Sequence, residues 1–182
     1  ISTINEKRKE QPAVITFIDD DCRKEVATVL YPLIKNLNIP YTLACPPNNL
    51  GKEDYLAIED FKTIVNNTDG VDIDIISHHY TETKMTEMTE FENIVSYEKD
   101  TKNCLTWFKN NGIEVNGVAY PNGAIHEEYM PVVEENFELG FTTDRGINTL
   151  PYESYYIDRC EVFPENGKYN IGDLIVSFPL PF

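Results

Sequence analysis

Predicted strands and helices alternate along this chain, and this alternation limits its possible folds more than any other feature. Short β-rich apolar runs are typical of buried strands, and apolar residues spaced three or four apart are typical of amphipathic helices. Each predicted helix is long enough for a crossover, so the pattern favours a parallel α/β sheet or barrel. The predicted strands cover residues 13–18, 40–45, 71–77, 113–120 and, near the end, 140–143, 155–163 and 173–178; the predicted helices cover 23–38, 53–67, 89–111 and 126–137.

Polar clusters follow three of the predicted strands, at residues 19–21, 78–82 and 120–123. Parallel strands all end on the same side of a sheet, so these clusters should converge on one face, where α/β folds place their chemistry. The first cluster is three consecutive aspartates. Adjacent carboxylates repel one another, so they call for a metal ion, a raised pKa or exposure to solvent. An acidic turn with Asp21 as the N-cap of the next helix is the alternative.

His78 and Glu82 in the second cluster are four residues apart. One turn of helix there would place both side chains on the same face, toward one cation. With one carboxylate from the first cluster they would supply three protein ligands, which leaves positions open for water and substrate. The alternative is that the paired histidines are exposed loop residues.

These clusters resemble the motifs of the NodB-type polysaccharide deacetylases, carbohydrate esterase family 4. The family's T-F-D-D-G is similar to the segment 16–21 (TFIDDD), its H-[ST]-x-x-H to 78–82 (HHYTE), and its R-x-P-x-G to 119–123 (AYPNG). The motifs occur in the family's order, over residues 12–163. The resemblance implies a distorted (β/α) barrel that removes N-acetyl groups from an N-acetylhexosamine polymer such as peptidoglycan, a chitin-like chain or a surface glycan.

By this resemblance, Asp19 is the general base, and Asp20 and His78 are ligands of one divalent metal ion. Glu82 stands where the family has a second histidine, and we expect it to be the third ligand. We expect zinc, with manganese, cobalt or magnesium as alternatives. The physical logic agrees, because a divalent ion lowers the pKa of bound water and a neighbouring carboxylate can take its proton.

The third motif implies that a backbone N–H near Asn122 meets the oxyanion of the reaction. Ala119 replaces the arginine that orients the base in the family. We expect Arg159, or alternatively Arg145, to take its place from elsewhere in the chain.

Tyr80, Tyr120 and Pro121 belong to the motifs, and we expect them to contact substrate. The family's last motif, L-x-H, has no counterpart, because residues 174–178 (LIVSF) contain no histidine. His126 is the remaining histidine, and we interpret it as a surface residue at a helix N-terminus. A domain impaired in catalysis, which binds glycans or serves as a structural module of a larger surface or phage-tail protein, is therefore the alternative to an active deacetylase.

The net charge of −16 would repel nucleic acid and anionic membranes, and it suits a neutral or cationic substrate or a metal ion. No apolar run approaches the roughly 18 residues of a membrane span. The four cysteines are scattered and show no zinc-site spacing.

We expect a single deacetylase-like domain over residues 12–182, after a linker or frayed terminus at 1–11. No signal peptide is visible and the chain begins at Ile1, so we expect a processed protein or an excised domain; the resemblance favours an extracellular or cell-surface location.

Overall fold

The computed structural model describes residues 15–66, 70–80, 94–149 and 151–160, together with the backbone of two short strands, β6 (Pro164–Glu165) and β7 (Lys168–Tyr169). The other strands are β1 (Ile18–Asp20), β2 (Tyr41–Cys45), β3 (Ile73–Ser77), β4 (Gly117–Ala119) and β5 (Leu139–Phe141). The longer helices are α2 (Tyr31–Leu37), α3 (Ile58–Val65), α4 (Ile94–Asn110) and α5 (Met130–Asn136). The shorter helical segments are η1 (Val26–Leu30), η2 (Pro47–Asn49), η3 (Pro121–Gly123) and η4 (Glu127–Tyr129). None of the described helices is both long and apolar enough to cross a membrane.

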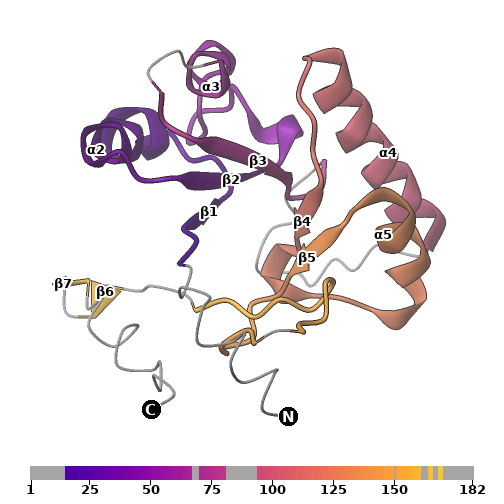
Figure 1. The fold of residues 1–182 in the computed structure, drawn as a ribbon. Coiled ribbons are helices and arrows are strands. Elements are labelled where there is room, and N and C mark those ends of the chain that lie inside the picture. Colours follow the sequence, from indigo (N-terminus) through magenta and orange to yellow (C-terminus); the bar gives the residue numbers. More distant parts are fainter. Residues whose placement is uncertain are drawn as a thin grey trace, which may run out of the picture.

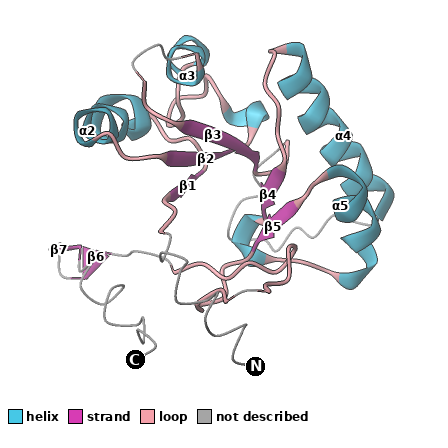
Figure 2. Ribbon diagram, viewed as in Figure 1, coloured by secondary structure: helices cyan, strands magenta, loops and turns pink. Residues whose placement is uncertain are grey.

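Strands β1 to β5 form one parallel sheet in which the spatial order is the order along the chain. Such an order arises when every crossover turns the same way, as it does in barrels. The sheet is curled into a half-barrel, with the helices around its outer side (Figure 1, Figure 2). The prediction of a distorted (β/α) barrel is confirmed. Ile157 extends the sheet through a parallel bridge to Phe141 of β5, and this pairing brings residues 154–160 beside the end of that strand.

The two faces of the curled sheet have different surroundings, because successive strand residues point to opposite sides. On the outer face Tyr41, Leu43 and Ile75 belong to the main apolar core, together with Phe61 of α3 and Phe108 of α4. On the inner face a separate, smaller cluster contains small and apolar residues from all five strands: Ala44, Ile76 and Ala119, with Ile18 and Phe141 packed against them. Adjacent residues of one strand therefore face different environments.

The first strand differs from the prediction of a buried run over 13–18. It is Ile18–Asp20, so it includes the first two aspartates, while Ile15 is 54% and Phe17 43% exposed. In the described part of the sheet β1 pairs with β2 alone, so it is an edge strand, and apolar composition does not by itself bury an edge. Residues 13 and 14 lie outside the described residues, as do 1–11 and the predicted strand at 173–178.

The helix predicted at 23–38 begins as the π-helical segment η1 and continues as α2. The spacing of its apolar residues predicts one buried side. Val26 and Ile34 on that side are buried, but Val29, Leu33 and Leu37 are more than half exposed. A π-helical turn contains more residues than an α-helical turn, so positions that a regular helix would align are rotated apart. The position of the helix was predicted correctly, but the predicted burial of Val29, Leu33 and Leu37 was wrong.

Candidate functional site

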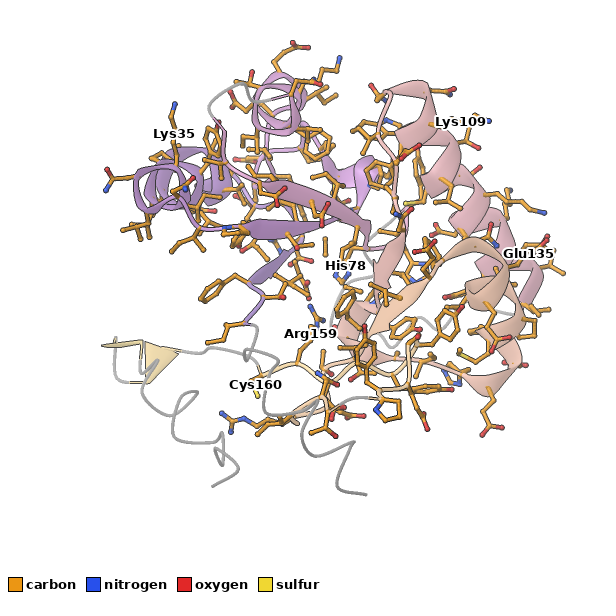
Figure 3. All side chains as sticks on the ribbon, in the orientation of Figure 1. Lys35, His78, Lys109, Glu135, Arg159 and Cys160 are labelled. Carbon is orange, nitrogen blue, oxygen red and sulfur yellow. The ribbon has the colours of Figure 1, made fainter. Side chains whose placement is uncertain are left out.

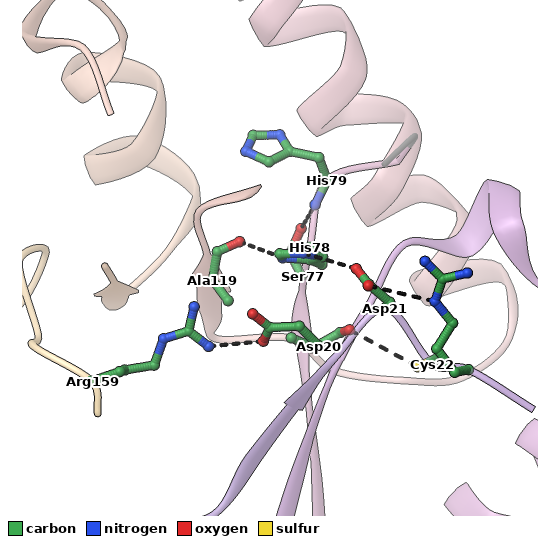
Figure 4. A network of polar contacts seen from close by, with 10 residues as sticks. Asp20, Asp21, Cys22, Ser77, His78, His79, Ala119 and Arg159 are labelled. Carbon is green, nitrogen blue, oxygen red and sulfur yellow. Dashed lines mark hydrogen bonds and ion pairs between the residues drawn. The ribbon is translucent and has the colours of Figure 1, made fainter. Parts of the chain in front are cut away.

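The polar residues that follow β1, β3 and β4 lie together at the carboxyl edge of the sheet. His78 and Arg159 are neighbours in the middle of the molecule, whereas Lys35, Lys109 and Glu135 project from the outer helices (Figure 3). Figure 4 shows the contacts that connect the end of β1 with His78 on one side and Arg159 on the other.

Asp19 points to the outer face of the sheet, away from the other two aspartates. Its carboxylate interacts with the hydroxyl of Tyr41, a residue of the main apolar core. Burial, followed by the charges of Asp20 and Asp21, raises the pKa of Asp19 to about 6. Its Oδ1 is buried and has no hydrogen-bond partner among the described residues. The structure therefore does not bring Asp19 to His78 or to Arg159.

Asp20 points to the inner face, where its Oδ1 accepts a 2.8 Å hydrogen bond from Nη1 of Arg159. The guanidinium is itself fixed, because its Nε donates to the carbonyl of Thr142 at 2.7 Å. The backbone N–H of Arg159 donates to the carbonyl of Asp144 at 3.0 Å. Arg159 thus reaches the first cluster from 139 residues further along the chain, whereas Arg145 is exposed.

Asp21 follows β1 and faces the second cluster, with its Oδ1 3.4 Å from Nε2 of His78. It does not cap a helix, because η1 begins only at Val26 and its N-cap position is Glu25. Burial favours the neutral form of Asp21, but the contacts with His78 and Arg23 outweigh it and lower the pKa. Nε of Arg23 lies 3.6 Å from the other carboxylate oxygen.

His78 is 3% exposed, and its ring is oriented by the end of β4. Nδ1 lies 2.8 Å from the carbonyl oxygen of Ala119, so this nitrogen carries a hydrogen and Nε2 of the neutral ring is an acceptor. Nε2 therefore faces another acceptor, the carboxylate of Asp21, and a proton or a metal ion between them would relieve the repulsion. Burial lowers the pKa of His78, yet Asp21, Asp20 and the Ala119 carbonyl together raise it.

This arrangement fits one half of a metal site. A histidine whose other nitrogen donates to a backbone carbonyl is the usual form of a metal ligand, and a carboxylate oxygen beside it suits zinc or manganese. Within the described ranges no three His, Cys, Asp or Glu side chains converge so as to hold a metal ion. Glu82, the predicted third ligand, lies outside the described residues.

The turn after β3 is held from the side by α4. The backbone N–H of Tyr80 donates to Oδ2 of Asp100 at 2.8 Å, and the same oxygen lies 3.5 Å from Nδ1 of His79. Oγ of Ser77 accepts from the N–H of His79 at 3.1 Å. His79 and Tyr80 are therefore not an exposed loop: His79 is 2% exposed and Tyr80 is half-buried.

The residues after β4 occupy different positions. Tyr120 is 1% exposed, and its hydroxyl donates to the carbonyl of Tyr155 at 3.0 Å, so its side chain belongs to the core and is not placed to contact substrate. Pro121 is half-buried and begins η3. Asn122 is exposed with a left-handed φ of 56°, so the chain turns sharply here. His126, which is half-buried at the N-cap of η4, contacts the ring of Tyr129 edge-on.

Two residues of this polar network, Asp21 and Asp100, were not among the predicted catalytic or metal-binding residues. Asp21 could have been found from the two-residue period of a strand, which predicts that Asp19 and Asp20 point to opposite faces. Asp100 has no local signal, because an acid on an amphipathic helix is usually a solvated residue.

A parallel half-barrel with acids, an arginine and a histidine at its carboxyl edge defines the class of fold, the distorted barrel of the polysaccharide deacetylases. The chain resembles the deacetylase PplD from Streptococcus pyogenes, solved in complex with acetate, with a TM-score of 0.74 and 19% identity over 87% of this chain and 69% of that one. The structure of IcaB from Ammonifex degensii matches with a TM-score of 0.74 and 19% identity, over 86% of this chain and 71% of that one. The deacetylase domain of BpsB from Bordetella bronchiseptica matches with a TM-score of 0.62 and 16% identity, over 86% and 75%. No family model and no curated protein matches the sequence.

Proposed function

We propose that this chain is a metal-dependent hydrolase that removes N-acetyl groups from an N-acetylhexosamine-containing polysaccharide. One observation carries the proposal: two adjacent aspartates at the end of β1 contact the two partners that such chemistry needs. Asp20 contacts Arg159 at 2.8 Å, and Asp21 contacts His78 at 3.4 Å. The fold shared with PplD, which is described as a deacetylase in complex with acetate, supports the same reaction class.

The contacts favour roles one residue later than the motif comparison implies. Asp20 is the general base, oriented by Arg159, and Asp21 is the metal ligand beside His78. With this shift Cys22 stands at the glycine position of T-F-D-D-G, and its φ of 52° lies in the left-handed region that favours glycine. Asp19, which points to the core, has no role in the chemistry.

A divalent ion held by Asp21 and His78, with Glu82 as the expected third ligand, would supply the positive charge that makes water a nucleophile near neutral pH. Asp20 takes the proton of the attacking water, and Arg159 holds its carboxylate in place for that transfer. The leaving nitrogen needs one proton to depart as an amine, and the proton taken by Asp20 balances the reaction. The N–H groups of the turn at Asn122, which follows β4 at the same edge of the sheet, are our candidates for stabilising the oxyanion.

The test compares matched substitutions of neighbouring aspartates. Purified protein loaded with Zn²⁺, Mn²⁺ or Co²⁺ is incubated with chito-oligomers and with peptidoglycan, and released acetate is measured. We expect Asp20→Asn to lower kcat/KM by about 10²–10⁴, the usual contribution of a general base. Asp19→Asn makes the same chemical change one residue earlier, and we expect it to leave kcat/KM within about threefold.

The outcomes separate the alternatives. If Asp19→Asn abolishes activity and Asp20→Asn does not, the roles implied by the motif comparison are correct and the shift is wrong. If the metal-loaded wild-type protein releases no acetate from any N-acetylated glycan but still binds one, the chain is a glycan-binding or structural module instead.

A further inference from the structure

We infer that Asp100 of α4 is a positioning residue for the His78 ring. The inference rests on the proposed function, because it concerns how the proposed metal site is held. Asp100 lies 22 residues after His78 in the chain and, in the described residues, contacts the two residues that follow His78 rather than His78 itself.

The turn after β3 needs an external support. His79 has a φ of 60°, a left-handed conformation that a residue with a side chain adopts only when its surroundings impose it. It is also 2% exposed, so solvent does not satisfy its backbone or ring. A small change at this residue would redirect the chain on both sides of it, including the Cα–Cβ direction of His78.

Asp100 supplies this support at the point where the turn ends. Its Oδ2 accepts the N–H of Tyr80 at 2.8 Å, and its side chain is 14% exposed, so the bond is largely shielded from water. One helical turn later Cys104 of α4 contacts Oγ of Ser77 at 3.2 Å, and that hydroxyl accepts the N–H of His79. Two positions on one face of α4 therefore hold the turn at both ends.

His78 itself is held from the other side. Its N–H donates to the carbonyl of Cys45 at 3.2 Å, and its ring donates to the carbonyl of Ala119 at 2.8 Å. These contacts constrain His78 from one side and the turn that follows constrains it from the other, so the direction of Nε2 toward Asp21 depends on both (Figure 4). Asp100 is the charged side chain that fixes this turn.

A catalytic role for the pair His79 and Asp100 is a less satisfactory explanation. The two side chains resemble a histidine–carboxylate dyad, but the His79 side chain is 2% exposed and its ring packs edge-on against Tyr97, with ring centroids 4.9 Å apart. A substrate cannot reach a ring in this position. The pair therefore acts through the turn.

The test uses two variants with opposite expectations. Asp100→Ala removes the acceptor for Tyr80, and we expect Co²⁺ affinity to weaken by about 10–100-fold, as is usual when a group that orients a ligand is lost. Asp100→Asn keeps an oxygen of the same reach without the charge, and we expect affinity within about threefold of wild type. Val133→Ala is the matched control, because Val133 is a buried residue in a different core cluster and its truncation lowers stability without touching the turn.

A second readout needs no metal and no activity. The chain has three histidines, so a long-range ¹H–¹⁵N spectrum of the imidazoles contains three rings to assign. In metal-free wild-type protein we expect His78 as the Nδ1–H tautomer bonded to Ala119, retained in Asp100→Asn and averaged between tautomers in Asp100→Ala. If Asp100→Ala does not fold, Asp100→Glu replaces it, because this variant keeps the charge but moves the carboxylate. A positioning role for Asp100 then predicts the same loss of Co²⁺ affinity and of the single His78 tautomer.

The inference is overturned if folded Asp100→Ala, or Asp100→Glu in its place, keeps both its Co²⁺ affinity and the His78 tautomer. The inference is also overturned if Asp100→Asn loses as much Co²⁺ affinity as Asp100→Ala. The negative charge of Asp100, and not its hydrogen-bond acceptor, would then be what the site requires. If the wild-type protein binds no Co²⁺ and releases no acetate, the proposed function fails, while the imidazole spectrum still decides whether Asp100 positions His78.

Discussion

The end of β1 and the end of β3 form two halves of one site, but different forces hold them. β1 is an edge strand of three residues, and its aspartates are fixed by side chains from distant parts of the chain, Arg159 and His78. β3 lies inside the sheet, and the histidines after it are 3% and 2% exposed and fixed by backbone carbonyls and by α4. The acidic half, at the end of β1, therefore depends on contacts between charged side chains. The histidine half, at the end of β3, depends on buried hydrogen bonds, so substitutions should affect the two halves differently.

The largest expected effect comes from removing one proposed metal ligand from either half. We expect Asp21→Ala and His78→Ala each to weaken Co²⁺ binding by more than about 100-fold, because even residues that only orient ligands contribute 10–100-fold. Their effects on the fold should differ. His78→Ala leaves the buried Ala119 carbonyl without its donor and should cost about 1–3 kcal/mol, whereas Asp21→Ala should cost less than about 1 kcal/mol.

Cobalt titration and urea denaturation in a chelator measure these two quantities. Equal stability losses in both variants would show that the two halves are held alike. Unchanged Co²⁺ affinity in folded Asp21→Ala would remove Asp21 from the ligand set.

The pH dependence of the free energy of unfolding tests the charge of Asp19, the first aspartate of the acidic half. Its pKa is raised from 3.8 to about 6 in the folded protein, so the folded state binds the proton more tightly than the unfolded state. Stability is therefore greatest below pH 4 on account of this group, and it falls as the pH rises to about 6. At 1.36 kcal/mol per pKa unit the loss is about 3 kcal/mol.

Asp19→Asn removes this titration. In chelator, the variant should match wild type near pH 4 and exceed it by about 3 kcal/mol at pH 7.5, as measured by urea denaturation. A constant difference between the two proteins across this range would mean that Asp19 is not buried in its charged form.

The sequence was sufficient to predict the order of elements and the edge of the sheet where the site lies. Alternating periodicities predict crossovers between parallel strands. Parallel strands bring residues 19–21, 78–80 and 120–123 to one side of the sheet whatever the details of packing. The limits of β1 were wrong because periodicity does not distinguish an edge strand from a central one. The burial of Tyr120 could not be predicted, because an aromatic residue after a strand can equally face the core.

The roles of the three aspartates could not be resolved by motif comparison. A motif of two acids fits a run of three in two registers, and only the direction of each side chain distinguishes them. That direction is set by β1 pairing with β2, where Asp19 lies beside Leu43 and Asp20 beside Ala44, residues of different faces. The contact of Arg159 with Asp20 needed the full fold, since no local pattern connects residues 139 positions apart.

A substitution of Arg159 should have a smaller effect, and it tests one contact of the acidic half, the one with Asp20. Arg159→Gln removes the cation beside Asp20 while its side chain can still reach the carbonyl of Thr142. We expect kcat/KM to fall by about 10–100-fold, because a misplaced base retains part of its effect, with Co²⁺ affinity unchanged. Steady-state kinetics with a parallel cobalt titration separates the two. A loss of metal affinity as large as the loss of rate would place Arg159 in support of the metal ligands instead of the base.

The smallest effect is expected at Arg23, which contacts the same cluster from the solvent side. Its Nε is 3.6 Å from Asp21, and the side chain is 44% exposed with its guanidinium over the ring of Tyr55. Exposed ion pairs contribute about 0–1 kcal/mol, so Arg23→Gln should change kcat/KM and Co²⁺ affinity by less than about fivefold. The same substitution at Arg159 is the matched comparison, because each arginine contacts one of two adjacent aspartates and the two arginines differ chiefly in burial. Equal losses at the two positions would show that net positive charge near the cluster, and not a fixed contact with Asp20, is what the acidic half requires.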